Sequence, residues 1–508
     1  MDQVKAIYRP IWTTGRYNAE NRVAIYYNLL EGMSYFFEEE SADVIGRLLE
    51  IPRNEKLDFE EFITRSGLEK EILDPFLEEL AKLNLITFHP ITAEGILNYR
   101  TALSEWKRDN FSFNDRSTKE KLPFETTSAE MAYSSKVKGV FGIMLEMTYN
   151  CSEKCIHCYN IGATRNDEEI SHRIVDNEMS LEDYKQAIDQ LYDKGLVKVT
   201  LSGGDPFSKN CTWDLIEYLF EKGIAFDVFT NGQRLVGLEK KLADYYPRLV
   251  GVSIYSGEAE VHDRITRIKG SYHKSMDVLN TLADLAVPLN IKCCVMRPNF
   301  KTYRMINDIA KSLGAFPQFE LSVTDSVDGD KCVSKFLRLT PEQYEIALRD
   351  ANTPLYVGVE APNYGGQQKD LTQNGCGAGY ESFCIAPNGD VMPCCAFHMP
   401  IGNLSSQDLD TILQSPKLAE WRNSTLREFE ECGKYEYCAY CNLCPGLGFS
   451  EHGDWRMASE NCCYVAKIRY DVASKMMDGY DPLKGESIDE AIKQFKDYED
   501  VKIKRETR

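Results

Sequence analysis

Three cysteines within eight residues constrain this chain more than any other feature of its sequence. The stretch reads Cys151-Ser-Glu-Lys-Cys155-Ile-His-Cys158, so three residues separate the first two thiols and two separate the last two. A loop with this spacing can bring its thiolates to one face of an iron-sulfur cube and leave the fourth iron without a protein ligand. The open iron is then available for chemistry.

A zinc site or inert packing are the simpler interpretations of these thiols. Structural zinc usually takes four ligands in paired C-x2-C units. His157 lies between the last two thiols and not at ligand spacing. Both interpretations therefore fit the stretch less well than a cluster does.

The bulk composition is that of a soluble globular protein. The 508 residues are 43% hydrophobic and 27% charged, which predicts two to four domains. The opening MDQVKAIYRPIW has no signal-peptide pattern, and no apolar run reaches membrane-spanning length, so we expect a cytoplasmic protein with no membrane partner. Seventeen cysteines in such a chain favour reduced thiolates that bind metal.

Residues 1–105 are predicted to form a small domain of strands followed by helices. Strands are expected at Val23–Tyr27 and Met33–Phe37, and Ser41 is expected to cap a helix over Ala42–Leu49. A second helix follows. Asp74, as the N-cap before Pro75, would begin a third helix, whose apolar stripe is Phe76, Leu77, Leu80 and Leu83.

This order of elements looks like a winged helix-turn-helix, for which DNA binding is the usual inference. Residues 66–85, however, contain five acidic residues against two lysines, a poor match to phosphate. The net charge of -20 argues in the same direction, so we expect no nucleic-acid partner. A structural cap without a ligand stays open as an alternative.

Strands and helices alternate after a polar linker at 106–138. Strands are predicted at Phe141–Met147, Val197–Leu201, Ala225–Phe229, Leu249–Ile254, Leu289–Val295 and Phe319–Val323. Helices are predicted at Ser180–Lys194, Thr212–Lys222, Glu239–Tyr246, Tyr272–Ala286 and Lys301–Leu313. Six βα units predict an α/β fold, in which a parallel sheet over 139–330 curls into a partial (β/α)6 barrel. The cysteine loop follows the first strand, at the carboxyl end where ligands bind.

The loop Cys151–Cys158 resembles the C-x3-C-x-aromatic-C signature of the radical S-adenosylmethionine (radical SAM) superfamily, with His157 at the aromatic position. The resemblance implies that Cys151, Cys155 and Cys158 hold a catalytic 4Fe-4S cluster and that S-adenosylmethionine binds its open iron. It also implies that His157 packs near the adenine. Electron transfer would then release a deoxyadenosyl radical that abstracts hydrogen from the substrate.

Two strand ends resemble the parts of that family that bind S-adenosylmethionine. Gly203-Gly204-Asp205-Pro206 resembles the Gly-Gly-Glu-Pro motif that holds the amino group, with Asp205 in place of the commoner Glu. At the end of the fourth strand, Ser253 would reach the ribose and Arg264 the carboxylate. The simpler interpretations are a plain turn, a polar strand end and a surface ion pair.

Ten of the seventeen cysteines lie between Cys376 and Cys463, after a bridging segment at 331–375 in which Thr340-Pro-Glu-Gln predicts a helix start. The spacing Cys376-x12-Gly389-x4-Cys394 resembles the opening of the SPASM domain, a C-terminal extension of radical SAM enzymes that carries auxiliary 4Fe-4S clusters. We expect this domain over 376–475 and a helical surface tail over 476–508. A zinc ribbon at Cys438–Cys444 is the alternative, but it leaves Cys376 and Cys394 unexplained.

The SPASM resemblance implies two auxiliary clusters. Cys376, Cys394 and Cys444 would hold the inner one, with Cys384 or an exogenous group as fourth ligand. Cys432, Cys438, Cys441 and Cys463 would hold the outer one. Their C-x5-C-x2-C order looks like that of maturases that form sulfur-to-carbon thioethers in ribosomal peptides.

The N-terminal domain, 1–105, also resembles the winged-helix precursor-recognition element of peptide-modifying enzymes, which implies that a leader peptide adds a strand to its sheet edge and rests on its third helix. Together these resemblances imply a radical SAM/SPASM maturase of a precursor peptide. An electron donor such as flavodoxin or ferredoxin would be its other partner. Carbon-carbon crosslinking, epimerisation and sulfatase-maturase-like oxidation of a Cys or Ser are alternative chemistries. A non-enzymatic iron or redox sensor is the alternative of a different class.

Overall fold

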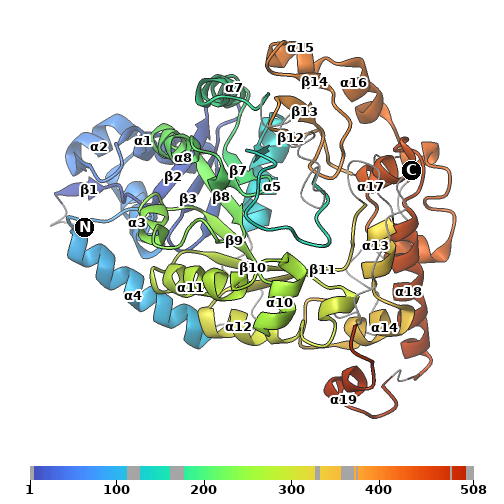
Figure 1. The fold of residues 1–508 in the computed structure, drawn as a ribbon. Helices are drawn as coiled ribbons and strands as arrows, with labels where there is room; N and C mark the ends of the chain where they lie inside the picture. Colours follow the sequence, from blue (N-terminus) through green and yellow to red (C-terminus); the bar gives the residue numbers. More distant parts are fainter. Residues whose placement is uncertain are drawn as a thin grey trace.

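The computed structural model describes residues 5–110, 126–160, 177–325, 332–355, 371–372, 374, 376–480 and 483–498. A nine-stranded sheet forms the centre of this described part, in the order β11-β10-β9-β8-β7-β6-β12-β13-β14 (Figure 1). Its strands are β6 Gly142–Glu146, β7 Lys198–Ser202, β8 Ala225–Thr230, β9 Leu249–Ser253, β10 Leu289–Cys294, β11 Phe316–Glu320, β12 Ser382–Ile385, β13 Asp390–Met392 and β14 Gly402–Asn403.

The six strands β6 to β11 pair in parallel and in chain order. The helices between them are α7 Leu181–Asp193, α8 Thr212–Lys222, α9 Glu239–Ala243, α10 Ala259–Thr266, α11 Ser271–Asp284 and α12 Met305–Leu313. The predicted α/β fold with its parallel sheet is confirmed. The sequence analysis missed α10 and placed β11 three residues too late. Pro317 lies inside β11, which is tolerated because this strand is the edge of the sheet.

The two faces of the barrel strands differ. Ile143 and Leu145 of β6, like Val199 and Leu201 of β7, are buried in the core beneath the helices. Successive side chains of a strand point to opposite faces, so Gly142, Met144, Glu146, Lys198 and Thr200 belong to the concave face.

The C-terminal cysteine-rich region extends the barrel sheet. β12 pairs in parallel with β6, from Ser382 opposite Gly142 to Ile385 opposite Leu145, and β13 and β14 continue antiparallel. The helices of the C-terminal third are α13 Cys332–Leu337, α14 Pro341–Arg349, α15 Leu409–Leu413, α16 Pro416–Asn423, α17 Pro445–His452, α18 Glu460–Met477 and α19 Ile488–Lys493. Thr340 caps α14 as predicted.

The helix predicted in the tail is α19, and it is not a purely surface element. Ala491 and Ile492 are buried in the main core, and the ring of Phe495 packs edge-on against Phe300 at 5.3 Å. Among the described residues, every helix is too short or too polar to cross a bilayer.

The N-terminal unit contains the predicted hairpin followed by helices. Its strands are β1 Ala6–Tyr8, β2 Thr13–Asn18, β3 Val23–Asn28, β4 Met33–Glu38 and β5 Lys56–Asp58. Its helices are α1 Glu39–Glu50, α2 Phe59–Ser66, α3 Lys70–Lys82, α4 Ala93–Asn110 and α5 Thr126–Val137. The turn between β3 and β4 contains Gly32 at φ +77°, the left-handed conformation that glycine adopts without strain.

Two helix starts differ from the prediction. α1 begins at Glu39, so Ser41 lies in its first turn and donates to the carbonyl oxygen of Glu38 at 2.6 Å. α3 begins at Lys70, so Asp74 is not its N-cap and Pro75 lies inside it. Leu73 and Leu77, on either side of the proline, are both buried, and their packing keeps this turn helical.

The N-terminal sheet closes the amino end of the barrel. One face of β3 packs on α1, α2 and α3, and the other packs against α5 and the amino ends of the barrel strands. α4 runs beside α11 and α12 (Figure 1), where the Arg100 guanidinium donates to the carbonyl oxygen of Ala243 at 2.8 Å and Lys107 to that of Ala286 at 2.9 Å. The predicted linker, 106–138, contains the end of α4 and all of α5, while 111–125 lie outside the described residues. The domain boundaries themselves stay predictions.

Candidate active site

The loop from Cys151 to Cys158 leaves the carboxyl end of β6 and docks on α10. The backbone N–H groups of Lys154 and Ile156 donate to the carbonyl oxygens of Thr266 and Ile265, each at 3.0 Å. These carbonyls belong to the end of a helix, where they have no partner within the helix itself. The unpredicted helix α10 therefore fixes the conformation of the predicted cysteine loop.

The three thiols of the loop lie within electrostatic range of one another. Burial raises the pKa of Cys151 to about 12 and that of Cys158 to about 11. The pKa of Cys155 is also raised, first by burial and then by the charges of Glu153 and the other two thiols. Thiolates gathered in such a place need a cation, which a bound iron cluster supplies.

Asn231, which follows β8, is a site residue that the sequence analysis missed. Its side-chain amide donates to the sulfur of Cys151 at 3.3 Å, and its backbone N–H donates to the Asp205 carboxylate at 3.0 Å. Hydrogen bonds to cluster sulfurs tune the reduction potential. The signal available in the sequence was weak: Thr230-Asn231-Gly232 is a polar strand end before a glycine.

The predicted glycine pair packs directly on the segment that leads into the cysteine loop. A Cβ on Gly203 would lie 2.4 Å from the carbonyl oxygen of Thr148, and one on Gly204 would lie 2.4 Å from that of Asn150. Gly203 also has φ +121°. The N–H of Gly204 donates to Thr148 O at 2.6 Å, which locks the two loops together. Only glycine fits at both positions.

Asp205 is fully buried, and its carboxylate makes hydrogen bonds within the protein. Its carboxylate accepts from the Thr230 hydroxyl at 2.6 Å and from the backbone N–H groups of Phe207 and Asn231 at 3.0 Å each. The side chain thus joins the glycine loop to the end of β8. The backbone of the loop, and not this carboxylate, is what the structure offers to a ligand.

His157 lies in an aromatic group at the edge of the cysteine loop. Its ring meets Tyr255 edge-on at 4.6 Å, and Tyr255 stacks on His262 at 5.5 Å. Burial lowers the pKa of His157 to about 4, so the ring is neutral at pH 7. Its Nδ1 is buried without a hydrogen-bond partner among the described residues. This buried nitrogen suits contact with a heterocycle such as adenine.

Ser253 and Arg264 are placed differently from each other. Ser253 is the last residue of β9, at the carboxyl end of the sheet where the cysteine loop also lies. Arg264 has an exposed side chain on α10, within electrostatic range of Asp497. The geometry therefore favours Ser253 over Arg264 as a ligand contact.

The cysteines predicted for the inner auxiliary cluster lie together. The pKa of Cys376 is raised by burial and by the charge of Cys394, and that of Cys444 is raised to about 12, with Cys394 and Cys376 among the causes. Burial and the charges of Glu146 and Cys394 raise the pKa of Cys384, so Cys384 also lies near Cys394. It is, however, fully buried on β12 in a small group with Ala386 and Met392.

Three of the four cysteines predicted for the outer cluster, Cys438, Cys441 and Cys463, border the same site. Burial and the charges of Cys438 and Cys462 raise the pKa of Cys463. Cys441 approaches the carbonyl oxygen of Cys462 at 3.8 Å, so both members of the Cys462–Cys463 pair border this site. Either cysteine of the pair is therefore placed to serve as a ligand.

The donor sets fit iron-sulfur clusters. Three thiols converge on the cysteine loop, and two further groups converge in the C-terminal region. No three His, Cys, Asp or Glu side chains in the described ranges are close enough to bind one metal ion. A cube needs no such convergence, because its thiolates bind different iron atoms and stand farther apart.

Comparison with known proteins gives two matching families. Residues 145–311 match the radical SAM superfamily, and residues 376–445 match SPASM, described as an iron-sulfur cluster-binding domain. The chain is therefore a radical SAM enzyme with a SPASM domain. More particularly, its cofactors are 4Fe-4S clusters and S-adenosylmethionine, as the cysteine spacing predicted.

Individual relatives share this core. The chain is 26% identical to the antilisterial bacteriocin subtilosin biosynthesis protein AlbA of Bacillus subtilis, over 67% of this chain and 74% of the relative. It is 25% identical to an AdoMet-dependent heme synthase of Nitratidesulfovibrio vulgaris, over 63% of this chain and 91% of the relative. Streptococcus suis SuiB bound to S-adenosylmethionine has a similar fold, with a TM-score of 0.51 and 15% identity over 90% of this chain and 99% of SuiB.

Proposed function

We propose that this enzyme modifies a ribosomally made precursor peptide and forms thioether crosslinks between a cysteine sulfur and a carbon atom. A radical SAM core with a SPASM domain does not by itself choose the substrate, since relatives include both a bacteriocin biosynthesis protein and a heme synthase. The choice rests on the N-terminal unit.

The observation that carries the proposal is the edge of the N-terminal sheet. Among the described strands, β4 pairs with β3 alone, so no other described strand occupies its second edge. Beside it lies α3, where the ring of Phe76 meets Phe37 of β4 edge-on at 5.9 Å and Ile72 is 60% exposed. An extended leader peptide can add a strand to such an edge and rest its apolar side chains on the helix.

The unit is also fastened to the barrel. Buried hydrogen bonds from Arg100, Ser104 and Lys107 of α4 end on carbonyl groups of the barrel helices and the loops that follow them. A leader held on β4 would therefore keep the rest of the peptide at high local concentration near the barrel. A domain that moved freely on a hinge would give the peptide a lower local concentration near the barrel.

In this proposal, Cys151, Cys155 and Cys158 hold the cluster that binds S-adenosylmethionine. Gly203, Gly204 and Ser253 line the nucleotide, His157 packs near its adenine, and Asp205 fixes the glycine loop. When bound, the cluster and nucleotide supply the deoxyadenosyl radical that abstracts hydrogen. The inner set (Cys376, Cys394, Cys444) and the outer set (Cys432, Cys438, Cys441, Cys463) hold the auxiliary clusters, and flavodoxin or ferredoxin supplies electrons.

Thioether formation is favoured over the other chemistries by the cysteine order Cys432-x5-Cys438-x2-Cys441. The test uses enzyme with reconstituted clusters and, as candidate substrates, short cysteine-bearing peptides encoded by reading frames next to its gene. A thioether product loses two hydrogens and resists thiol alkylation. A product that loses two hydrogens but keeps its thiols free indicates carbon-carbon crosslinking, and a product of unchanged mass indicates epimerisation. Either result contradicts the thioether proposal.

A further inference from the structure

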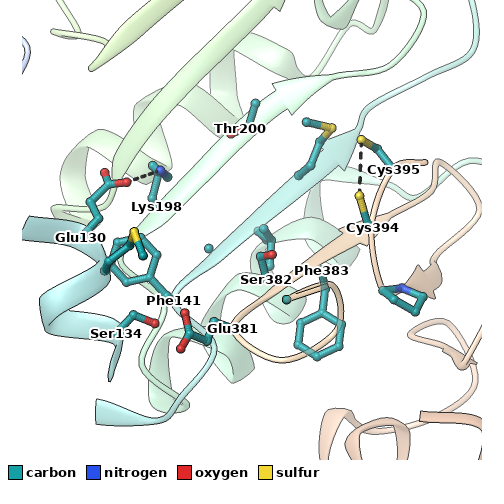
Figure 2. Close-up of a pocket in the computed structure, with 16 residues that line it drawn as sticks. Glu130, Ser134, Phe141, Lys198, Thr200, Glu381, Ser382, Phe383, Cys394 and Cys395 are labelled. Atoms are coloured by element: carbon teal, nitrogen blue, oxygen red, sulfur yellow. Dashed lines mark hydrogen bonds and ion pairs between the residues drawn. The ribbon is translucent and has the colours of Figure 1, made fainter. Parts of the chain in front are cut away.

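A cavity of about 410 Å³ lies between the N-terminal unit, the barrel and the SPASM region (Figure 2). Helix α5 supplies Met131 and Ser134 to its wall, and the concave face of the barrel supplies Met144 and Thr200. Cys394 and Cys395 close it on the SPASM side. Three parts of the chain that are distant in sequence therefore meet at this cavity.

The cavity borders the inner cluster site and shares Cys394 with it. Its lining includes Cys394 but neither Cys376 nor Cys444, the two other cysteines of that set. Cys395 lies close enough to Cys384 and Glu146 for their charges to act on its thiol. Glu146 belongs to the concave face of the barrel. The cavity thus lies on the barrel side of Cys394.

The walls carry three charged side chains, Glu130, Lys198 and the exposed Glu381. Glu130 and Lys198 form an ion pair at 2.7 Å, visible in Figure 2, and the Tyr27 hydroxyl also donates to Glu130 at 3.1 Å. Ser134 also lines the cavity, but its hydroxyl oxygen is itself buried and offers no contact surface to an occupant.

The cavity begins beside the proposed leader site. Lys136 of α5 forms an ion pair with Glu38 of β4 at 2.8 Å, and Met131 at the cavity wall is 64% exposed. From Gly142 the concave face of β6 continues to Glu146, a rise of about 13 Å for four residues of strand. The cysteine loop follows a few residues later. The cavity therefore lies between the proposed leader edge and the site of the radical.

From this arrangement we infer that the cavity binds an extended segment of the precursor peptide without acidic side chains, namely the segment between its leader and its reacting residue. The inference rests on the proposed function. Met131 borders the entrance of the cavity. Acidic side chains are disfavoured in the segment because the exposed Glu381 carboxylate lines the wall and repels them.

The first experiment obstructs the entrance. The test variant is Met131→Trp. Its control is Met477→Trp, which changes another exposed methionine, on α18, that is 58% exposed. In the full enzyme with clusters, we expect Met131→Trp to lower the rate of precursor modification at least tenfold while a fluorescent leader peptide still binds with wild-type affinity. Met477→Trp keeps the wild-type rate. A wild-type rate in Met131→Trp, or loss of leader binding, overturns the inference.

A photo-crosslinking experiment keeps the inference distinct from the proposed function, because it needs no turnover. The enzyme is wild type, and capped tetrapeptides that carry photo-leucine at the position of valine serve as probes, with crosslinks to α5 or β6 mapped by mass spectrometry. We expect acetyl-Ala-Ser-Val-Ala-amide to crosslink and acetyl-Ala-Asp-Val-Asp-amide not to. If the uncharged probe fails to crosslink, or both crosslink equally, the cavity is not the site inferred here. If the wild type modifies no peptide while the uncharged probe crosslinks, the proposed function alone fails.

Discussion

The carboxylate of Asp205 accepts a hydrogen bond from the hydroxyl of Thr230 at 2.6 Å, in the interior of the protein. This bond joins the end of β7 to the end of β8. Since the next residue, Asn231, donates both to Asp205 and to Cys151, one buried carboxylate positions the glycine loop and a cluster ligand together.

Asp205→Ala should destabilise the fold and abolish activity. It leaves the Thr230 hydroxyl and two backbone N–H groups without their acceptor, which costs about 2 to 4 kcal/mol. Anaerobic urea unfolding and deoxyadenosine release measure the two effects. Asp205→Glu restores the commoner family residue, but in this fully buried site the added methylene overpacks, so we expect partial activity. Full activity in Asp205→Ala would show that the carboxylate positions nothing.

Gly204→Ala should prevent deoxyadenosine release. The new methyl group would lie 2.4 Å from Asn150 O and 2.7 Å from Tyr149 O, so the glycine loop and the approach to the cysteine loop must separate. Gly95→Ala is the matched control, because its methyl group meets only the side-chain oxygen of Thr92 at 3.2 Å in an α-helix. An active Gly204→Ala enzyme with normal binding of S-adenosylmethionine would contradict this account.

Asn231→Leu should make the reduction potential of the first cluster more negative. The variant removes the amide donor 3.3 Å from the Cys151 sulfur, and fewer hydrogen bonds to sulfur stabilise the reduced cluster less. A redox titration followed by electron paramagnetic resonance gives the potential. Asn280→Leu, on the exposed side of α11, is the control. An unshifted potential in Asn231→Leu would mean that this amide does not tune the cluster.

Stability should rise with pH through the Lys107 amine. Burial lowers the pKa of Lys107 to about 7 from 10.5, so the folded state releases this proton at lower pH than the unfolded state. The resulting gain begins as pH rises through 7 and is complete above 10.5. Linkage gives about 2 kcal/mol between pH 7 and pH 9. Unfolding experiments on Lys107→Met should lack this contribution, and an identical pH dependence in both proteins would refute it.

Iron content should distinguish the cysteine sets. Replacing Cys376 and Cys444 together with alanine should remove the iron of one cluster, and replacing Cys438 and Cys463 should remove that of another. Cys384→Ala should keep the full iron content, because Cys384 is buried among apolar side chains of β12. Loss of one cluster in that variant would instead make Cys384 the fourth inner ligand. Iron analysis and Mössbauer spectroscopy provide the measurement.

Several features that depend on residues close together in the sequence have the local structure that was predicted. The Cys151–Cys158 spacing, the glycine pair and the alternation of strands and helices all report local geometry, which needs no knowledge of the rest of the chain. Thr340 was predicted as a helix cap for the same reason. Local signals failed at Pro75 and Pro317, where a buried helix turn and an edge strand tolerate a proline.

Contacts between distant residues were decided by the tertiary structure alone. β12 joins β6 across more than two hundred residues, α10 supports the cysteine loop, and Asn231 reaches Cys151 from 80 residues away. Strand order and loop docking depend on which surfaces bury each other, and many partners satisfy the same local pattern. The sequence by itself thus determined the chemistry of the ligands, whereas packing decided which side chains surround them and where a peptide can reach them.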